Sequence, residues 1–142
     1  MLLSCYLMRK NAIAPERAHS SDAGLDLFYC PAVDRSGPSY ADGYEVKIFP
    51  GENALLGTGV KFGIPHGYML QVCNRGSMAG KRSLIVGAHI IDSGYQGEIL
   101  VDLHNVGYEP QVIKPGDKIA QLVMIPVIHA IPLIANNEES LY

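Results

Sequence analysis

The residue with the clearest chemical potential is Asp92, in a turn of sequence DSG at residues 92–94. The turn joins two apolar stretches, residues 84–91 and 97–105, which we interpret as the strands of a hairpin. The residues that flank the carboxylate are Ile90, Ile91 and Tyr95. Partial burial among such neighbours would make Asp92 a candidate base for activating water. The alternative is that Asp92 only hydrogen-bonds its own turn, as Asp commonly does.

The sequence consists of short apolar runs interrupted by Gly and Pro, a pattern that predicts an all-β domain. The strands of this domain would hold the turn in place. The strands are expected at residues 2–8, 24–29, 44–48, 53–60, 68–73, 84–91, 97–105, 111–113 and 119–127. Residues 31–43, rich in Pro, Ser, Gly and Asp, read as a surface loop to which we assign no role. The pattern suits a jelly roll or compact β-barrel formed by one domain, residues 1–142.

Composition excludes several classes of function. The net charge is −3 and no run of Lys or Arg exceeds two residues, so no nucleic-acid partner is expected. No apolar segment approaches the roughly 18 residues of a membrane span. The three cysteines are widely spaced and the five histidines form no HxH or HxxxH pair, which predicts a reducing, intracellular setting without a zinc site.

Four segments together resemble the first four motifs of the trimeric dUTPase family. They are AGLDLF (23–28), NRGSMAG (74–80), GAHIIDSGYQGEI (87–99) and KPGDKIAQLVMIPV (114–127). The resemblance, which covers residues 23–127 and includes viral or phage-type members, implies a dUTPase-like barrel or jelly roll. It also implies hydrolysis of dUTP to dUMP and pyrophosphate with Mg²⁺, a reaction that limits uracil incorporation into DNA.

The resemblance assigns the chemistry of the third motif to Asp92 and Tyr95. Asp92 stands where the family has the aspartate that activates the water attacking the α-phosphorus. Tyr95 stands where an aromatic ring packs on the deoxyribose and excludes a 2'-hydroxyl; its alternative is a ring that only fills the hairpin face. The uracil base would be read by the hairpin main chain, which a strand ladder holds rigidly. The residues expected to line the base are Val86, Ile90, Ile91 and Leu100.

The other motifs are implied to hold the triphosphate. Asp26 resembles the carboxylate that orients Mg²⁺ through water, as suits an ion that keeps much of its hydration shell. Arg75 can offer a bidentate fork to phosphate oxygens or to Asp92, and Gln121 can donate its amide. The second motif departs from the usual Arg-Ser-Gly order, because Gly76 precedes Ser77, so the hydroxyl would approach a phosphate from another angle.

Two further departures bear on substrate and closure. Val86 stands where many relatives carry a polar residue, which moves base recognition further onto the main chain. The glycine-rich fifth motif of the family is absent, since the sequence ends NNEESLY. We expect such a segment to follow as a mobile tail; the alternative is a protein that works without this lid.

Two other functions stay open from the sequence. The hairpin also resembles that of dCTP deaminases, which have a catalytic glutamate where this chain has Asp102, one methylene shorter. A displacement of about 1 Å can cost a proton-transfer step about 10²-fold. The third hypothesis is a regulatory module that binds the nucleotide without turnover.

The C-terminal run IAQLVMIPVIHAIPLI, residues 119–134, has more apolar surface than one exposed strand carries in water. Pro126 and Pro132 disfavour a central strand position. The resemblance implies a homotrimer in which C-terminal strands meet or cross between subunits. Each active site would then take the second and fourth motifs from one chain and the hairpin from its neighbour.

Overall fold

The computed structural model describes residues 1–32 and 44–142, and the predicted loop at 31–43 lies almost wholly outside this part. The strands of the described part are β1 (Ser4–Leu7), β2 (Leu25–Phe28), β3 (Val46–Ile48), β4 (Asn53–Gly57), β5 (Val60–Gly63), β6 (Tyr68–Cys73), β7 (Leu84–Val86), β8 (Ile90–Ile91), β9 (Leu100–Asn105), β10 (Gln111–Ile113) and β11 (Lys118–Pro126). Two short helical segments, η1 (Ser77–Lys81) and η2 (Glu138–Leu141), complete it. No helix of this part is long and apolar enough to span a bilayer.

The strands form four antiparallel sheets, in the orders β1-β5, β10-β3, β2-β11-β6-β8 and β4-β9-β7. All four sheets contribute buried apolar side chains to one core. The alternation that predicted strands is plain in β9, where Val101, Leu103 and Asn105 are buried and the residues between them are more exposed. The expected all-β fold is confirmed.

Two predicted strands are divided in the structure. Residues 53–60 end as β4 at Gly57, and after a turn the chain resumes as β5, which pairs with β1 whereas β4 pairs with β9. Gly59 has φ +71°, a conformation that glycine adopts without strain, and it allows the chain to change sheets. Residues 84–91 divide into β7 and β8 in the same way.

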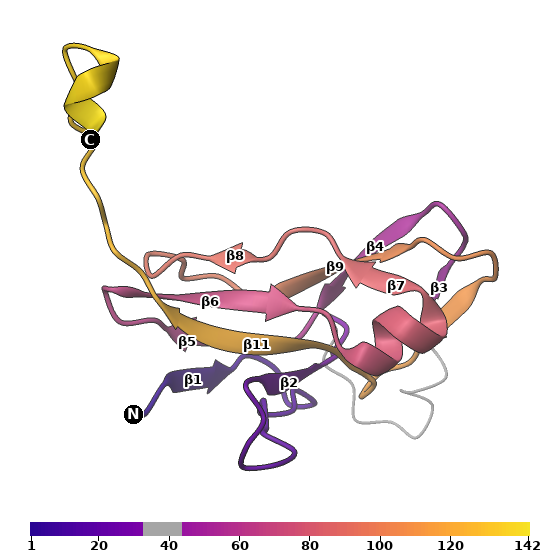
Figure 1. Ribbon diagram of the computed structural model, residues 1–142. Helices are drawn as coiled ribbons and strands as arrows, with labels where there is room; N and C mark the ends of the chain where they lie inside the picture. Colours follow the sequence, from indigo (N-terminus) through magenta and orange to yellow (C-terminus); the bar gives the residue numbers. More distant parts are fainter. Residues whose placement is uncertain (33–43) are drawn as a thin grey trace.

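The chain leaves the body of the domain after β11 (Figure 1). Val127 N donates to Gly67 O at 2.8 Å, and the His129 ring stacks on His66 with centroids 4.5 Å apart. Beyond this point the large apolar side chains are 66–98% exposed: Ile128, Ile131, Leu133, Ile134, Leu141 and Tyr142. This C-terminal arm, residues 128–142, therefore presents apolar surface that its own chain does not cover.

Candidate active site

The hairpin expected to carry Asp92 opens into a pocket. β7 pairs with β9 and the pairing ends where Gly87 N donates to Asp102 O at 2.8 Å. β8 then pairs with β6 instead, and Val72 N donates to His89 O at 2.7 Å. The prediction of one continuous hairpin was wrong, because its first arm changes partner strand after Gly87. The separation of the two arms creates the site.

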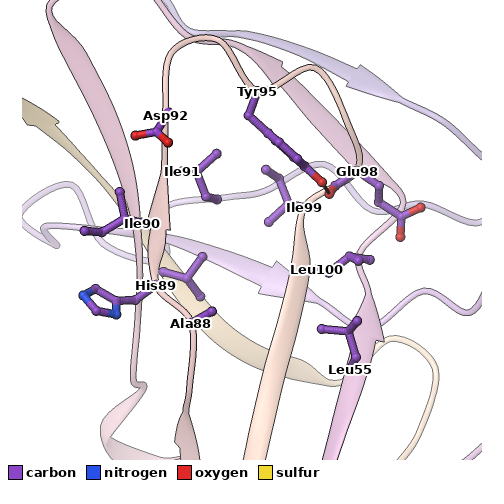
Figure 2. A pocket seen from close by; sticks show the side chains of 11 residues that line it. Leu55, Ala88, His89, Ile90, Ile91, Asp92, Tyr95, Glu98, Ile99 and Leu100 are labelled. Atoms are coloured by element: carbon purple, nitrogen blue, oxygen red, sulfur yellow. Dashed lines mark hydrogen bonds between the residues drawn. The ribbon is translucent and has the colours of Figure 1, made fainter.

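The pocket between the arms encloses about 230 Å³. Its lining residues are Leu55, Val72, Ala88, His89, Ile90, Ile91, Asp92, Tyr95, Glu98, Ile99 and Leu100, most of them shown in Figure 2. This volume is below the roughly 300–1,000 Å³ of sites that enclose a whole small ligand. It suits a base and sugar held in the pocket, with charged groups of the ligand outside.

Asp92 lies at the rim of the pocket with its side chain free. Its main-chain carbonyl, and not its carboxylate, closes the turn by accepting from Tyr95 N at 3.0 Å. The residue is exposed in the single chain, so the expected partial burial is not found there. Within the described residues its carboxylate has no hydrogen bond or ion pair, and it is therefore available to accept a proton from water.

Tyr95 lies beside Asp92 and is 44% exposed. Its hydroxyl donates to the carbonyl oxygen of Glu98 at 2.6 Å, the bond dashed in Figure 2. Gly97 permits this arrangement, because a Cβ there would lie 2.7 Å from the Tyr95 hydroxyl oxygen. One face of the ring is thus available to a ligand while its far end is tethered.

The expected base-contacting residues are only partly assembled. Ile90, Ile91 and Leu100 line the pocket, whereas Val86 does not. Val86 precedes the separation of the arms and still pairs with Leu103, and its N–H donates to Asn74 Oδ1 at 2.7 Å. Val86 was expected to line the pocket, and the structure places it outside.

Sequence reasoning missed Leu55 and Glu98 as lining residues. Leu55 is 63% exposed on β4, and an apolar residue on the outer side of a predicted strand was an available signal. Glu98 forms an ion pair with Arg9, 89 residues away, and no local pattern could reveal that partner. Burial raises the pKa of Glu98, but the hydrogen bond and positive charge of Arg9 outweigh it and hold the pKa below its usual range.

The residues assigned to the triphosphate form a second cluster. Asp26 Oδ1 lies 3.1 Å from Arg75 Nε, and Asp26 Oδ2 lies 3.1 Å from Lys118 Nζ. Arg75 Nη1 also donates to Ser77 Oγ at 3.3 Å. Lys118 was not among the residues predicted from the sequence to hold the triphosphate. Lys118 Nζ also lies 4.0 Å from Glu16 Oε1, so two cations face two carboxylates here. Arg75 and Lys118 are the groups of this cluster that could contact a phosphate.

Gln121 and Gly76 belong to the same region. Gln121 pairs with Asp26 across β11 and β2, and its Nε2 donates to Asn74 O at 2.8 Å. Gly24 makes room for it, because a Cβ there would lie 2.6 Å from Gln121 Oε1. Gly76 lies between Arg75 and Ser77, directly before η1. The first, second and fourth motif segments therefore meet where β6 ends and β11 begins.

The pocket and the cation cluster lie apart in one chain. In the register of β6 with β8, Asp92 follows the pair Ile91–Leu70 and is opposite Met69. From Met69 to Cys73 the strand rises about 13 Å at roughly 3.3 Å per residue, and Arg75 lies two residues further. Figure 1 shows η1 and the turn after β8 at opposite ends of β6. Within one chain, Asp92 and Arg75 therefore lie near opposite ends of β6.

Among the described residues, Asp26 is the carboxylate expected to contact a magnesium ion. In the described part of the chain no three His, Cys, Asp or Glu side chains are grouped so that they could hold a metal. Magnesium keeps several waters and commonly takes one carboxylate together with substrate phosphates. Both oxygens of Asp26 already face cations. Asp26 therefore fits contact through a metal-bound water and does not fit direct coordination.

Asp102, the residue on which the deaminase alternative rests, has both carboxylate oxygens in contact with neighbouring side chains. Asn53 Nδ2 donates to its Oδ1 at 2.8 Å and His104 Nε2 lies 2.8 Å from its Oδ2. Burial raises the pKa of Asp102, but these two contacts outweigh it and the pKa is lowered. Asp102 is not among the pocket-lining residues, and its oxygens are occupied.

Comparisons with known proteins agree with this geometry. The family model described as dUTPase matches residues 39–141. The deoxyuridine 5'-triphosphate nucleotidohydrolase of Gloeobacter violaceus is 43% identical over 115 residues, 80% of this chain and 71% of that protein. The corresponding protein of Ehrlichia canis is 36% identical over 126 residues, 87% and 75% of the two chains.

Solved structures of phage enzymes show the same fold. A mutant dUTPase from phage phi11 of S. aureus, whose structure concerns the coordination of a structural Mg(II) ion, has a TM-score of 0.82 at 26% identity and covers 98% of this chain and 99% of that one. A mutant dUTPase of Staphylococcus bacteriophage 80alpha with dUpNHpp has a TM-score of 0.82 at 25% identity and covers 97% of this chain and 98% of that one. Family model, sequence relatives and fold agree, and the chain belongs to the dUTPase family.

Proposed function

We propose that the protein hydrolyses dUTP to dUMP and pyrophosphate and that Asp92 is the base. The observation that carries this role is the unpaired Asp92 carboxylate at the rim of an apolar pocket sized for a base and sugar. Asp92 takes a proton from a water molecule, and the water oxygen attacks the α-phosphorus. The bond from this phosphorus to the bridging oxygen breaks, and pyrophosphate leaves. The relatives named above carry the same activity in their names.

Uracil and deoxyribose occupy the pocket in this proposal. Ile90, Ile91 and Leu100 pack on the base, and the main chain of the separated arms supplies its polar contacts. The Tyr95 ring lies on the sugar where a 2'-hydroxyl would collide with it. The structure of the 80alpha enzyme with dUpNHpp supports a deoxyuridine nucleotide as the ligand class.

The triphosphate lies against the cation cluster of Arg75 and Lys118, with Ser77, Gly76 and Gln121 as further donors. Guanidinium and ammonium groups neutralise phosphate oxygens, and Arg does so with a fixed fork. Asp26 would hold Mg²⁺ through a metal-bound water. When bound, the ion withdraws charge from phosphate oxygens and fixes their orientation.

The separation of the pocket from the cation cluster supports a site shared between subunits, which we propose to be those of a homotrimer. Asp92 of one chain acts on a triphosphate held by Arg75 of a neighbour, since the two lie at opposite ends of β6 in one chain. The exposed apolar C-terminal arm supports such an assembly, because a neighbouring subunit would cover it. Light scattering is expected to give about three times the 15.4 kDa chain mass. A stable, active monomer would contradict the shared site.

Product analysis with dUTP, dCTP, dTTP and UTP tests the reaction. Pyrophosphate and dUMP are expected from dUTP in the presence of Mg²⁺, far faster than products from the other three. Ammonia released from dCTP would contradict the proposal and direct attention to Asp102. Binding of dUTP without turnover would support the regulatory alternative. No disulfide joins Cys5, Cys30 and Cys73, which supports an intracellular setting.

A further inference from the structure

An ion pair joins the N-terminal segment to Glu98, a residue of the third motif that lines the pocket beside Tyr95. Arg9, which follows β1, donates from Nη1 to Glu98 Oε1 at 2.6 Å and from Nη2 to Glu98 Oε2 at 2.9 Å. The two side chains are only 13% and 15% exposed. Arg9 Nη2 also donates to Cys30 O at 2.8 Å. The pair therefore connects the N-terminal segment, the end of β2 and the pocket wall.

The main chain beside Glu98 is held from several directions. Ile99 N donates to Val60 O at 2.9 Å, and Thr58 Oγ1 donates to Ile99 O at 2.6 Å. The carbonyl of Glu98 accepts the Tyr95 hydroxyl at 2.6 Å. The position of the Tyr95 ring thus depends on the carbonyl of a residue whose side chain is fixed by Arg9.

The surrounding fold leaves space for this pair. A Cβ at Gly57 would lie 2.5 Å from Glu98 Oε2, 3.0 Å from Cys30 O and 3.1 Å from Arg9 Nη2. A Cβ at Gly59 would lie 3.4 Å from the same Arg9 nitrogen. Gly57 at the end of β4 and Gly59 in the turn before β5 therefore accommodate the ion pair.

Such a pair is better suited to positioning than to stabilising. The desolvation of two charges offsets most of their attraction, so an ion pair of this burial adds little net stability over an apolar replacement. A bidentate Arg–carboxylate contact does fix the relative orientation of the segments that it joins. To exclude a single hydroxyl group, the Tyr95 ring must be held within about 0.5 Å of the required position.

We propose that Arg9 and Glu98 are positioning residues that hold the Tyr95 ring against the sugar and so set the discrimination between deoxyribonucleotides and ribonucleotides. This inference rests on the proposed function. Neither side chain touches the reacting atoms, and Asp92 lies on the other side of the turn. Loss of the pair therefore changes which sugar is accepted more than it changes the rate of the chemical step.

The test uses Glu98→Gln and Arg9→Lys in the full chain. Glu98→Gln keeps the shape and removes the charge, and Arg9→Lys keeps the charge and removes the fork. Asp102→Asn is the matched control, because Asp102 is another partly buried, hydrogen-bonded acid on the neighbouring strand. Each protein is assayed for kcat and KM with dUTP and UTP, and for affinity to dUMP and UMP by calorimetry, which needs no hydrolysis.

Both variants are expected to reduce the preference for deoxyribose by about five- to tenfold, the factor set by one hydrogen bond. The change appears in KM and in the dUMP/UMP affinity ratio, with kcat for dUTP within about threefold, and the Asp102→Asn control keeps the preference of the wild type. In Tyr95→Phe, which lacks the tethered hydroxyl, Glu98→Gln should cause little further loss.

An unchanged dUMP/UMP affinity ratio in either folded variant would overturn the inference. So would an equal loss of dUTP and UTP turnover, which is the result expected of a purely structural pair. A wild-type protein that does not distinguish dUMP from UMP would overturn it as well. A wild-type protein that prefers dUMP over UMP but does not hydrolyse dUTP would contradict the proposed function. If the two variants lose this preference, the positioning role of Arg9 and Glu98 is supported even then.

Discussion

The substitution Asp92→Asn distinguishes a catalytic base from a turn former, because loss of a base should lower the rate and leave the stability almost unchanged. The turn is closed by the main-chain carbonyl of Asp92, which asparagine retains, and the carboxylate has no partner in the described chain. We therefore expect the free energy of unfolding to change by no more than about 0.5 kcal/mol. Loss of a general base should lower kcat about 10²- to 10⁴-fold, or about 3–5 kcal/mol in barrier height.

The assay is pyrophosphate release at saturating dUTP, with urea unfolding of the same preparations. Asp117→Asn is the matched control, since the carboxylate of Asp117 does serve its own turn by accepting from Lys114 N at 2.8 Å. This control should keep its activity. The reasoning is refuted if Asp92→Asn keeps more than about a tenth of the wild-type kcat, or if it loses stability while its activity is intact.

Three further outcomes are expected. Tyr95→Ala should relax the discrimination between dUTP and UTP, and unchanged discrimination would show that the ring only packs. Asp26→Asn should raise the Mg²⁺ concentration needed for half-maximal activity while leaving dUMP affinity unchanged; an unaltered Mg²⁺ dependence would remove Asp26 from the metal site. Despite burial, contacts with Asn53 and His104 lower the pKa of Asp102, so its ionised form stabilises the fold above about pH 4 and that stabilisation is lost as the pH falls further. Urea unfolding of Asp102→Asn should consequently show a smaller loss of stability than wild type on acidification, and parallel curves would contradict this.

The parts of the fold that were predicted from sequence are those with local signals. β6 and β10 match the predicted strands residue for residue, because Gly and Pro turns bound them. The divisions at Gly57 and Gly87 were missed, since a change of partner strand depends on residues distant in sequence. The apolar residues continue across both divisions. The sequence pattern therefore predicts one strand at residues 53–60 and one at residues 84–91.

The residues of the candidate site, like the strands, were predicted in part from the sequence. Asp92, Tyr95, Ile90, Ile91 and Leu100 do line one pocket. Two of the residues missed have partners distant in sequence, namely Glu98 with Arg9 and Lys118 with Asp26. The burial expected of Asp92 was also not found in a single chain, and in the proposed trimer a neighbouring subunit would supply it.

Subunit complementation tests the central claim, which is a site that joins Asp92 of one chain to Arg75 of another. Asp92→Asn and Arg75→Ala proteins, each nearly inactive alone, are coexpressed in equal amounts with different tags, and doubly tagged oligomers are isolated. In randomly mixed trimers about one quarter of shared sites would have both residues intact. We predict recovery of roughly that fraction of wild-type dUTP hydrolysis, somewhat more after selection for mixed oligomers. No recovery in verified mixed oligomers would contradict the account, because a site built within one chain is never repaired by its neighbour.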